Sequence, residues 1–232
     1  MALLGWYYPF FLPILAVPVA LMVLWRLQTP EPSSDQGLSE YLRNTFLAIR
    51  NPQALVLFFA SLITFVILYG AYLTYLPFLL RQSFDASPVL IGLLFSATSV
   101  ATAITSFRLG RLARRFSPQK LIYAGFILYA LSMTALPLAP TITLLLLPAA
   151  LFGVANGISI PSILTMLTGL APAEYRGAFM SVNATVLRMG QTLGPLVAGA
   201  MMQFRGLSGA YFGSAVLAVA ALGVISTVMK EG

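Results

Sequence analysis

One arginine interrupts a long uncharged segment of the chain. Between Gly177 and Phe204 the only ionised residue is Arg188, and an ionised side chain near hydrocarbon costs about 2.5–3.5 kcal/mol or more and is usually functional. Helical spacing places five further residues on its face: Thr185, Gln191, Thr192, Pro195 and Gly199. This stripe predicts the wall of a cavity, with Arg188 and Gln191 as candidate substrate-binding residues. Alternatively, Arg188 lies two turns from a polar loop and extends to lipid phosphate groups.

Two further polar side chains are candidates because they stand in apolar segments. Asn156 lies within the 53 uncharged residues 121–173, and an amide at membrane depth needs either a neighbouring helix or a polar substrate as its partner. Tyr72 belongs to a set of residues spaced by three or four positions, which predicts a polar and aromatic helix face: Ser61, Thr64, Leu68, Tyr72 and Tyr75. Tyr75 also fits an interfacial aromatic belt, so Tyr72 and Asn156 complete the substrate-binding candidates.

The chain carries few groups that catalyse reactions. It contains no cysteine and no histidine, so thiol nucleophiles, imidazole acid–base chemistry and Cys or His metal ligands are excluded. All six acidic residues fall in predicted loops or the tail: Glu31, Asp35, Glu40, Asp85, Glu174 and Glu231. We therefore expect no catalytic residues, no metal and no cofactor. A lipid-modifying membrane enzyme would need an activated nucleophile or an acid cluster at the interface.

The composition indicates a polytopic membrane protein. Of the 232 residues, 59% are hydrophobic and 8% are charged, whereas soluble domains contain roughly 25% charged residues. The net charge of +7 could suggest nucleic acid, but nucleic-acid binders gather their basic residues on a solvated face, which this sequence lacks. We expect the lipid bilayer as partner and no nucleic acid.

Counting uncharged stretches of about 20 residues predicts seven spanning helices and an all-α bundle. Prolines and threonines at 137–143 divide the longest stretch into two. The predicted spans are residues 2–25, 54–80, 87–107, two within 121–173, 177–204 and 206–229. A β-barrel would need alternating hydrophobicity, and a signal peptide would need a basic region before its apolar run; both patterns are missing.

Basic residues predict the orientation, because they concentrate in short cytoplasmic loops. With seven spans, ten of the thirteen Lys and Arg residues lie on one side of the membrane. Arg81 and Arg205 lie on the other side, and Arg188 lies within a span. The ten are Arg26, Arg43, Arg50, Arg108, Arg111, Arg114, Arg115, Lys120, Arg176 and Lys230. We expect a multi-pass inner (plasma) membrane protein with its amino terminus outside and its carboxyl terminus in the cytoplasm.

Four regions follow from this topology. Residues 1–27 form a first helix, and residues 28–53 form a cytoplasmic linker, rich in Pro and Ser at its start, with a short amphipathic helix at the membrane surface. Residues 54–229 form a bundle of six transmembrane helices, and residues 230–232 are a cytoplasmic tail.

Small residues recur at helical spacing in two predicted spans. Gly153 and Gly157 are one pair, and Gly190, Gly194 and Gly199 with Pro195 are another set. Glycines allow close helix contact, and a proline removes a backbone hydrogen bond and allows bending. We favour static packing as the larger part of their role. Pro77 and Pro161 interrupt the first helix of each three-helix set, as in transporters built from inverted repeats.

This layout resembles the carboxyl-terminal portion of a major facilitator superfamily transporter, from its sixth helix onward. Residues 5–10, Gly-Trp-Tyr-Tyr-Pro-Phe, look like the start of the sixth helix in drug/proton antiporters. The turn with Gly110, Arg111, Arg114 and Arg115 resembles the second copy of the family's loop signature, although the family often has Asp at position 114 and Gly at position 117. Residues 190–195, Gly-Gln-Thr-Leu-Gly-Pro, are similar to the glycine-rich antiporter signature.

The resemblance implies a half-transporter that exports small amphipathic molecules by alternating access. It implies that five helices are missing through truncation, a fragment gene or a miscalled start, so the missing amino-terminal half is an expected partner. The resemblance also implies a small-molecule substrate and a coupling proton. The carboxylate that binds the proton, and a carboxylate partner for Arg188, would then lie in the missing half. A nutrient uptake permease and a non-transporting assembly or regulatory fragment are the alternatives.

Overall fold

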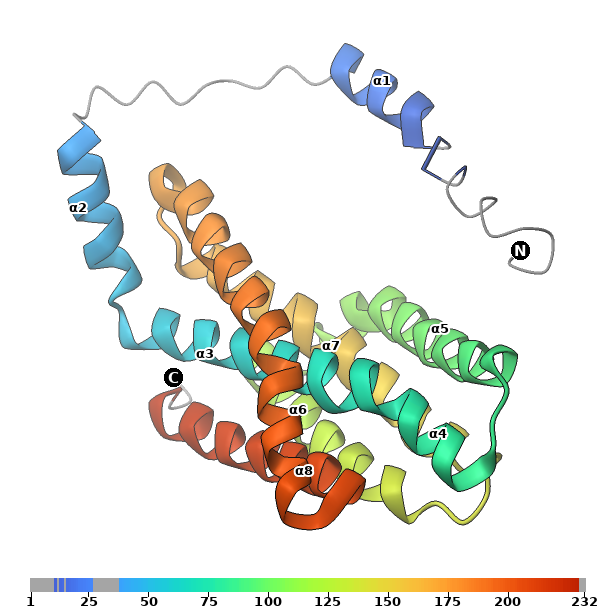
Figure 1. The fold of residues 1–232 in the computed structure, drawn as a ribbon. Coiled ribbons are helices and arrows are strands. Elements are labelled where there is room, and N and C mark those ends of the chain that lie inside the picture. Colours follow the sequence, from blue (N-terminus) through green and yellow to red (C-terminus); the bar gives the residue numbers. More distant parts are fainter. Residues whose placement is uncertain (1–10, 12, 15, 27–37, 230–232) are drawn as a thin grey trace. The chain divides into compact units, whose positions relative to one another are not determined.

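The structure is a computed structural model that describes residues 11, 13, 14, 16–26 and 38–229. Within these residues all regular structure is helical, which confirms the predicted all-α class. The chain divides into two compact units, Met1–Gln36 and Gly37–Gly232 (Figure 1). The first contains α1, Ala16–Arg26, whose residues are all exposed. The motif at residues 5–10 and the first part of the predicted linker, residues 28–37, lie outside the described residues.

The second unit starts with a helix at the predicted amphipathic segment. This helix, α2, spans Leu38–Ile49, and α3, Pro52–Ile67, follows almost directly. Asn51 marks the boundary because its side-chain oxygen accepts a hydrogen bond from the backbone N–H of Gln53, 2.9 Å away, at the start of α3. Proline at the first position of α3 suits a helix start because its missing N–H would be unpaired there.

A π-helical segment divides the first long apolar helix of this unit. The α3 helix continues into η2, Leu68–Tyr75, which has π-helical geometry, and then into α4, Leu76–Phe84. Pro77 stands at the start of α4, and a proline ring clashes with the carbonyl four residues earlier in an α-helix. The π-helical segment ends two residues before Pro77, and its wider turns suit a helix that must accommodate a proline ring. Asp85, with φ 47°, ends α4 in the left-handed conformation.

Two more helices begin with the same pair of residues. Ser87 caps α5, Pro88–Leu112, and Ser117 caps α6, Pro118–Ala135. Each serine hydroxyl accepts a backbone N–H three residues later, at 3.3 Å and 3.4 Å. A 3₁₀ turn, η3 (Leu136–Leu138), ends α6 at the prolines that predicted a break. The next helix, α7, covers Leu146–Leu170.

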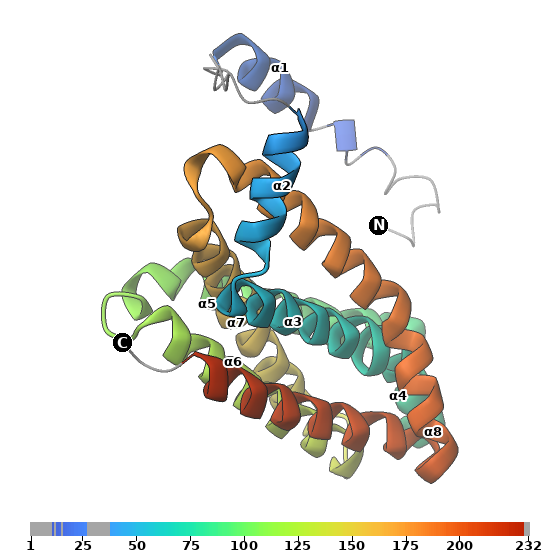
Figure 2. The same cartoon turned by 90° about the vertical axis from the view of Figure 1, so that its left-hand side faces the viewer.

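The last long helix consists of two limbs. It follows η4, Ala173–Tyr175, and α8 is assigned to Arg176–Val228, but Arg205 and Gly206 have non-helical backbone angles. Gly206 has φ 60° and ψ −152°, a conformation that side chains with a Cβ rarely adopt. The chain reverses there, as both views show (Figures 1 and 2). Five described helical stretches are long and apolar enough to cross a membrane, and this break makes the fifth a pair of spans.

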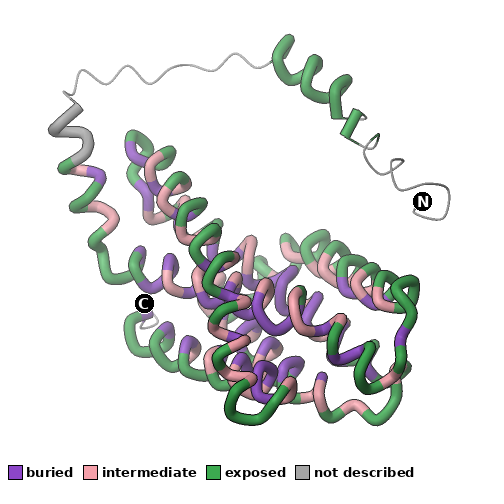
Figure 3. Tube along the Cα trace, in the orientation of Figure 1, coloured by how far each residue is buried: buried purple, intermediate pink, exposed green. Residues whose placement is uncertain are grey.

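Aromatic side chains fill the centre of the second unit. The Tyr72 ring stacks on the Phe152 ring with centroids 3.9 Å apart, and Tyr129 packs on the edge of Phe152. Large apolar side chains also cover the outside, and Phe107 and Phe204 are each 87% exposed. Figure 3 shows buried residues at the centre and exposed residues along α5. An apolar exterior this extensive fits lipid rather than water, as expected for an integral membrane protein.

Candidate functional site

The first part of the predicted stripe on α8 faces outward from the bundle, whereas Gln191, Pro195 and Gly199 are half-buried. Arg188 is exposed, and its Nη1 donates a hydrogen bond to Oε1 of Gln191 at 2.8 Å. Thr185 and Thr192 are also exposed, and their hydroxyls bond to the carbonyls of Ser181 and Arg188. No ion pair is formed by Arg188 within the part of the chain that the structure describes. The stripe can therefore offer a cation and an amide to a group outside this unit.

The opposite side of α8 is locked against α3 and η2 by glycines. Gly190 lies about 160° around the helix from Arg188. A Cβ on Gly190 would stand 2.9 Å from the carbonyl oxygen of Leu62, and one on Gly194 would stand 2.8 Å from the backbone nitrogen of Gly70. The partner glycine is equally tight, because a Cβ on Gly70 would stand 2.6 Å from the Gly194 oxygen. These contacts fix the direction in which the polar stripe points.

The proline and last glycine of this set contact a tyrosine. The hydroxyl of Tyr75 donates to the carbonyl oxygen of Pro195 at 3.3 Å, and a Cβ on Gly199 would stand 2.8 Å from the same hydroxyl. Tyr75 thus joins the end of η2 to α8. Thr74, beside it, donates to the carbonyl of Tyr69 at 2.6 Å, which occupies one carbonyl of the π-helical segment.

Gly153 and Gly157 form a second close contact, between α7 and α5. A Cβ on Gly157 would stand 2.7 Å from the carbonyl oxygen of Thr102. Hydroxyls of α5 bond directly to these glycines: Thr102 donates to the Gly153 carbonyl at 3.0 Å and Ser106 to the Gly157 carbonyl at 3.3 Å. Small residues with interhelical hydrogen bonds are typical of helix packing in membranes. Both glycine sets therefore occupy packing positions.

Two predicted substrate-binding residues are buried, which differs from the cavity face expected for Tyr72 and, of the two partners expected for Asn156, favours a neighbouring helix. Tyr72 is 1% exposed, and its hydroxyl contacts the hydroxyl of Thr98. Asn156 is 6% exposed and accepts a hydrogen bond from the hydroxyl of Tyr129 on α6 at 2.7 Å. The amide thus has a neighbouring helix as its partner. Helical spacing identifies a shared face but not what covers it, so the pattern did not distinguish core from cavity.

A small cavity between α3, α7 and α8, mostly apolar in its lining, contains a residue that the sequence pattern missed. Its volume is about 80 Å³, enough for water, which needs roughly 10–15 Å³ of such space. The lining includes Ser61, Thr64 and Asn183. The oxygens Oγ1 of Thr64 and Oδ1 of Asn183 are buried without a hydrogen-bond partner among the described residues. Asn183 carries the signal that identified Asn156, an amide in an apolar helix.

The loop-signature residues lie at the far end of α5. Gly110 is exposed, with no atom within 4 Å of an added Cβ, so it makes no close helix contact. Arg111, Arg114 and Arg115 are exposed and line a concave site of about 950 Å³. Among the described residues, no three or more Asp, Glu, His or Cys side chains are grouped to hold a metal ion.

Comparisons with known proteins match most of the second unit. Residues 71–230 match the family model described as Major Facilitator Superfamily. Multidrug resistance protein MdtG of Salmonella typhimurium strain LT2 is 26% identical over 164 residues, which are 69% of this chain and 41% of that protein. MdtG of Salmonella arizonae is 24% identical over the same shares. The match therefore covers less than half the length of these relatives.

A solved structure shares the fold. The human organic anion transporter MFSD10 (TETRAN) superposes with a TM-score of 0.64 at 19% sequence identity. The superposition covers 92% of this chain and 47% of the human one.

Proposed function

Because this chain belongs to the major facilitator superfamily, we propose that it forms the carboxyl-terminal part of a secondary transporter that exports small amphipathic molecules. Such transporters work by alternating access, in which one helical half rocks against the other around a site near the bilayer midplane. The other half is the missing amino-terminal half, and its five further helices supply the second side of the substrate path.

The observation that carries this proposal is the exposed Arg188 on α8 with its half-buried partner Gln191. An arginine on a spanning helix is stable there only if it meets water, a counter-charge or a polar ligand. Its hydrogen bond to Gln191 orients the guanidinium, and the glycine contacts on the reverse side of the helix prevent it from turning inward. In the complete transporter this stripe faces the path between the halves.

The observations favour export as the direction of transport and amphipathic molecules as the class of substrate. The relatives at 24–26% identity carry the name multidrug resistance protein. The described candidate residues are neutral apart from Arg188, which suits weakly polar molecules better than multiply charged ones. All six acidic residues lie outside the predicted spans, so a coupling proton is carried by a carboxylate in the other half. Without cysteine or histidine, we favour transport over catalysis.

The experiment is an efflux assay with the complete transporter in everted membrane vesicles, using fluorescent amphipathic dyes. Loss of a hydrogen bond to a charged group costs about 1.5–3 kcal/mol. We therefore expect Arg188→Ala to slow dye transport about tenfold or more, with partial recovery in Arg188→Lys. Arg205→Ala is the matched control, because Arg205 is exposed at the break between the limbs of α8, and it should transport normally.

Three outcomes would contradict the proposal. If Arg188→Ala and Arg205→Ala behave alike, the stripe does not line the path. If the complete protein moves solute in the uptake direction, it is a nutrient permease. If co-expression of the missing half yields no flux while the chain binds another partner stably, it serves as an assembly fragment.

A further inference from the structure

Four arginines border one concave site on the second unit. Arg108 and Arg111 are on the last turns of α5, and Arg114 and Arg115 are on the turn that follows. We propose that this site, of about 950 Å³, binds an anionic phospholipid. This proposal concerns a surface away from the α8 stripe and does not depend on the direction of transport.

The charge of the site selects an anion. All four arginines are exposed, they fall within eight consecutive positions, and the lining contains no acidic residue. Within the part of the chain that the structure describes, none of the four forms an ion pair. A guanidinium stays protonated at any physiological pH and binds phosphate oxygens in pairs through its planar N–H groups. A lipid phosphate would supply the missing counter-charge.

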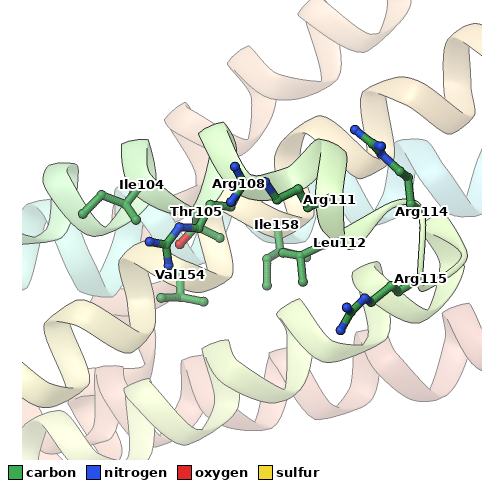
Figure 4. A pocket seen from close by; sticks show the side chains of 9 residues that line it. All are labelled: Ile104, Thr105, Arg108, Arg111, Leu112, Arg114, Arg115, Val154 and Ile158. Carbon is green, nitrogen blue, oxygen red and sulfur yellow. The ribbon is translucent and has the colours of Figure 1, made fainter.

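The apolar wall selects a lipid over a free anion. Ile104 and Leu112 of α5 and Val154 and Ile158 of α7 line the same site. Figure 4 shows that Arg108 and Arg115 lie on either side of the Leu112 and Ile158 side chains in this view. Inorganic phosphate would leave this apolar surface unused, whereas a phospholipid places its head group at the arginines and an acyl chain along the wall. Basic pockets between transmembrane helices bind lipid head groups in this manner.

The framework of the site is formed before a ligand binds. On one side, the α5–α7 contact is held by the Thr102 and Ser106 hydrogen bonds to Gly153 and Gly157. On the other, the backbone N–H groups of Arg115 and Phe116 donate to the carbonyl of Leu112, each at 2.9 Å. Ordering the turn therefore adds little entropic cost to binding.

The test measures lipid retention by the complete transporter. The protein is purified in detergent, incubated with phosphatidylglycerol or phosphatidylcholine, and examined by native mass spectrometry. Each basic residue near a lipid surface strengthens binding about fivefold. We therefore expect the triple variant Arg108→Gln/Arg111→Gln/Arg115→Gln to bind phosphatidylglycerol about a hundredfold more weakly. The control Arg81→Gln/Arg205→Gln, which removes basic residues at other positions, should bind as the unaltered protein does.

Two further arms separate lipid from other anions. Ile104→Asn keeps all four arginines but polarises the apolar wall, and it should weaken phosphatidylglycerol binding several-fold while the melting temperature in neutral lipid stays constant. Inorganic phosphate at equal concentration should not displace the lipid. The proposal is overturned if both charge variants bind alike, if phosphatidylcholine binds as tightly, or if phosphate displaces the lipid. Constant lipid binding in Ile104→Asn, or occupation of the site by an acidic segment of the other half, would also overturn it.

Discussion

The residues of this chain separate into those that hold the helices together and those that face outward. Asn156 and Arg188 illustrate the difference, because both are polar residues in long apolar helices. Asn156 is buried and bonded to Tyr129, whereas the Arg188 side chain is exposed and donates to Gln191, one turn along the same helix. The first is a structural amide, and the second retains donors for a ligand or for the other half.

The Asn156–Tyr129 bond can be measured directly. Interhelical side-chain hydrogen bonds in membranes contribute about 0.6 kcal/mol on average and at most about 1.7 kcal/mol. We expect Asn156→Leu and Tyr129→Phe each to lower the free energy of unfolding, and the double variant to lose less than the sum of the two. Additive losses in denaturant unfolding would show that the two side chains are not coupled. Dye efflux by folded Asn156→Leu should persist, since the amide is not on the substrate path.

At the scale of elements, two glycine seams position the outward faces. The α8 seam joins Gly190 and Gly194 to α3 and η2, and the α7 seam joins Gly153 and Gly157 to α5. The π-helical segment lies on the first seam, since Gly70 within η2 contacts Gly194. The π-helical segment before Pro77 thus also contains the close contact with α8. Such π-helical irregularities often occur at functional sites.

The α8 seam gives a prediction with a control on the second limb of α8. In Gly194→Ala the new methyl group would stand 2.8 Å from the Gly70 nitrogen and 2.9 Å from the Val66 carbonyl oxygen. Backbone atoms cannot rotate away, so the helices must separate, at a cost of about 1–3 kcal/mol. Gly223→Ala meets nothing within 4 Å and should be neutral or slightly stabilising. Equal melting temperatures for the two variants would contradict this packing.

At the scale of the whole molecule, the orientation rests on the distribution of basic residues. Ala113 is exposed beside the arginine turn, and Gln82 is exposed at the end of α4. We expect a membrane-impermeant thiol reagent to label Gln82→Cys in intact cells and to label Ala113→Cys only after permeabilisation. Labelling of Ala113→Cys in intact cells would show that the arginine turn lies outside the cell, which contradicts the predicted orientation.

Much of the fold could be predicted from charge, proline and helical spacing. The break within residues 121–173 occurs at the predicted prolines, and the reversal at Arg205 and Gly206 falls between two predicted spans. The π-helical segment was not predicted. In a helix that is apolar on most sides, the spacing of apolar residues does not reveal where a turn contains one more residue. Tyr72 was placed on a cavity wall because spacing carries no information about the neighbouring helices that cover it.

The proposed role of Arg188 requires that its stripe border a water-filled substrate path, which the accessibility of engineered cysteines can test. The 232 residues contain no cysteine, so single cysteines can be placed on this part without background. Thr192→Cys lies on the stripe, and Val216→Cys, 67% exposed on the second limb of α8, serves as the lipid-facing control. In the complete transporter, we predict that a water-soluble thiol reagent labels Thr192→Cys, that substrate slows this labelling, and that Val216→Cys stays unlabelled. If Thr192→Cys is as unreactive as Val216→Cys, the stripe faces lipid, and if substrate leaves its labelling rate unchanged, the stripe does not border the substrate path.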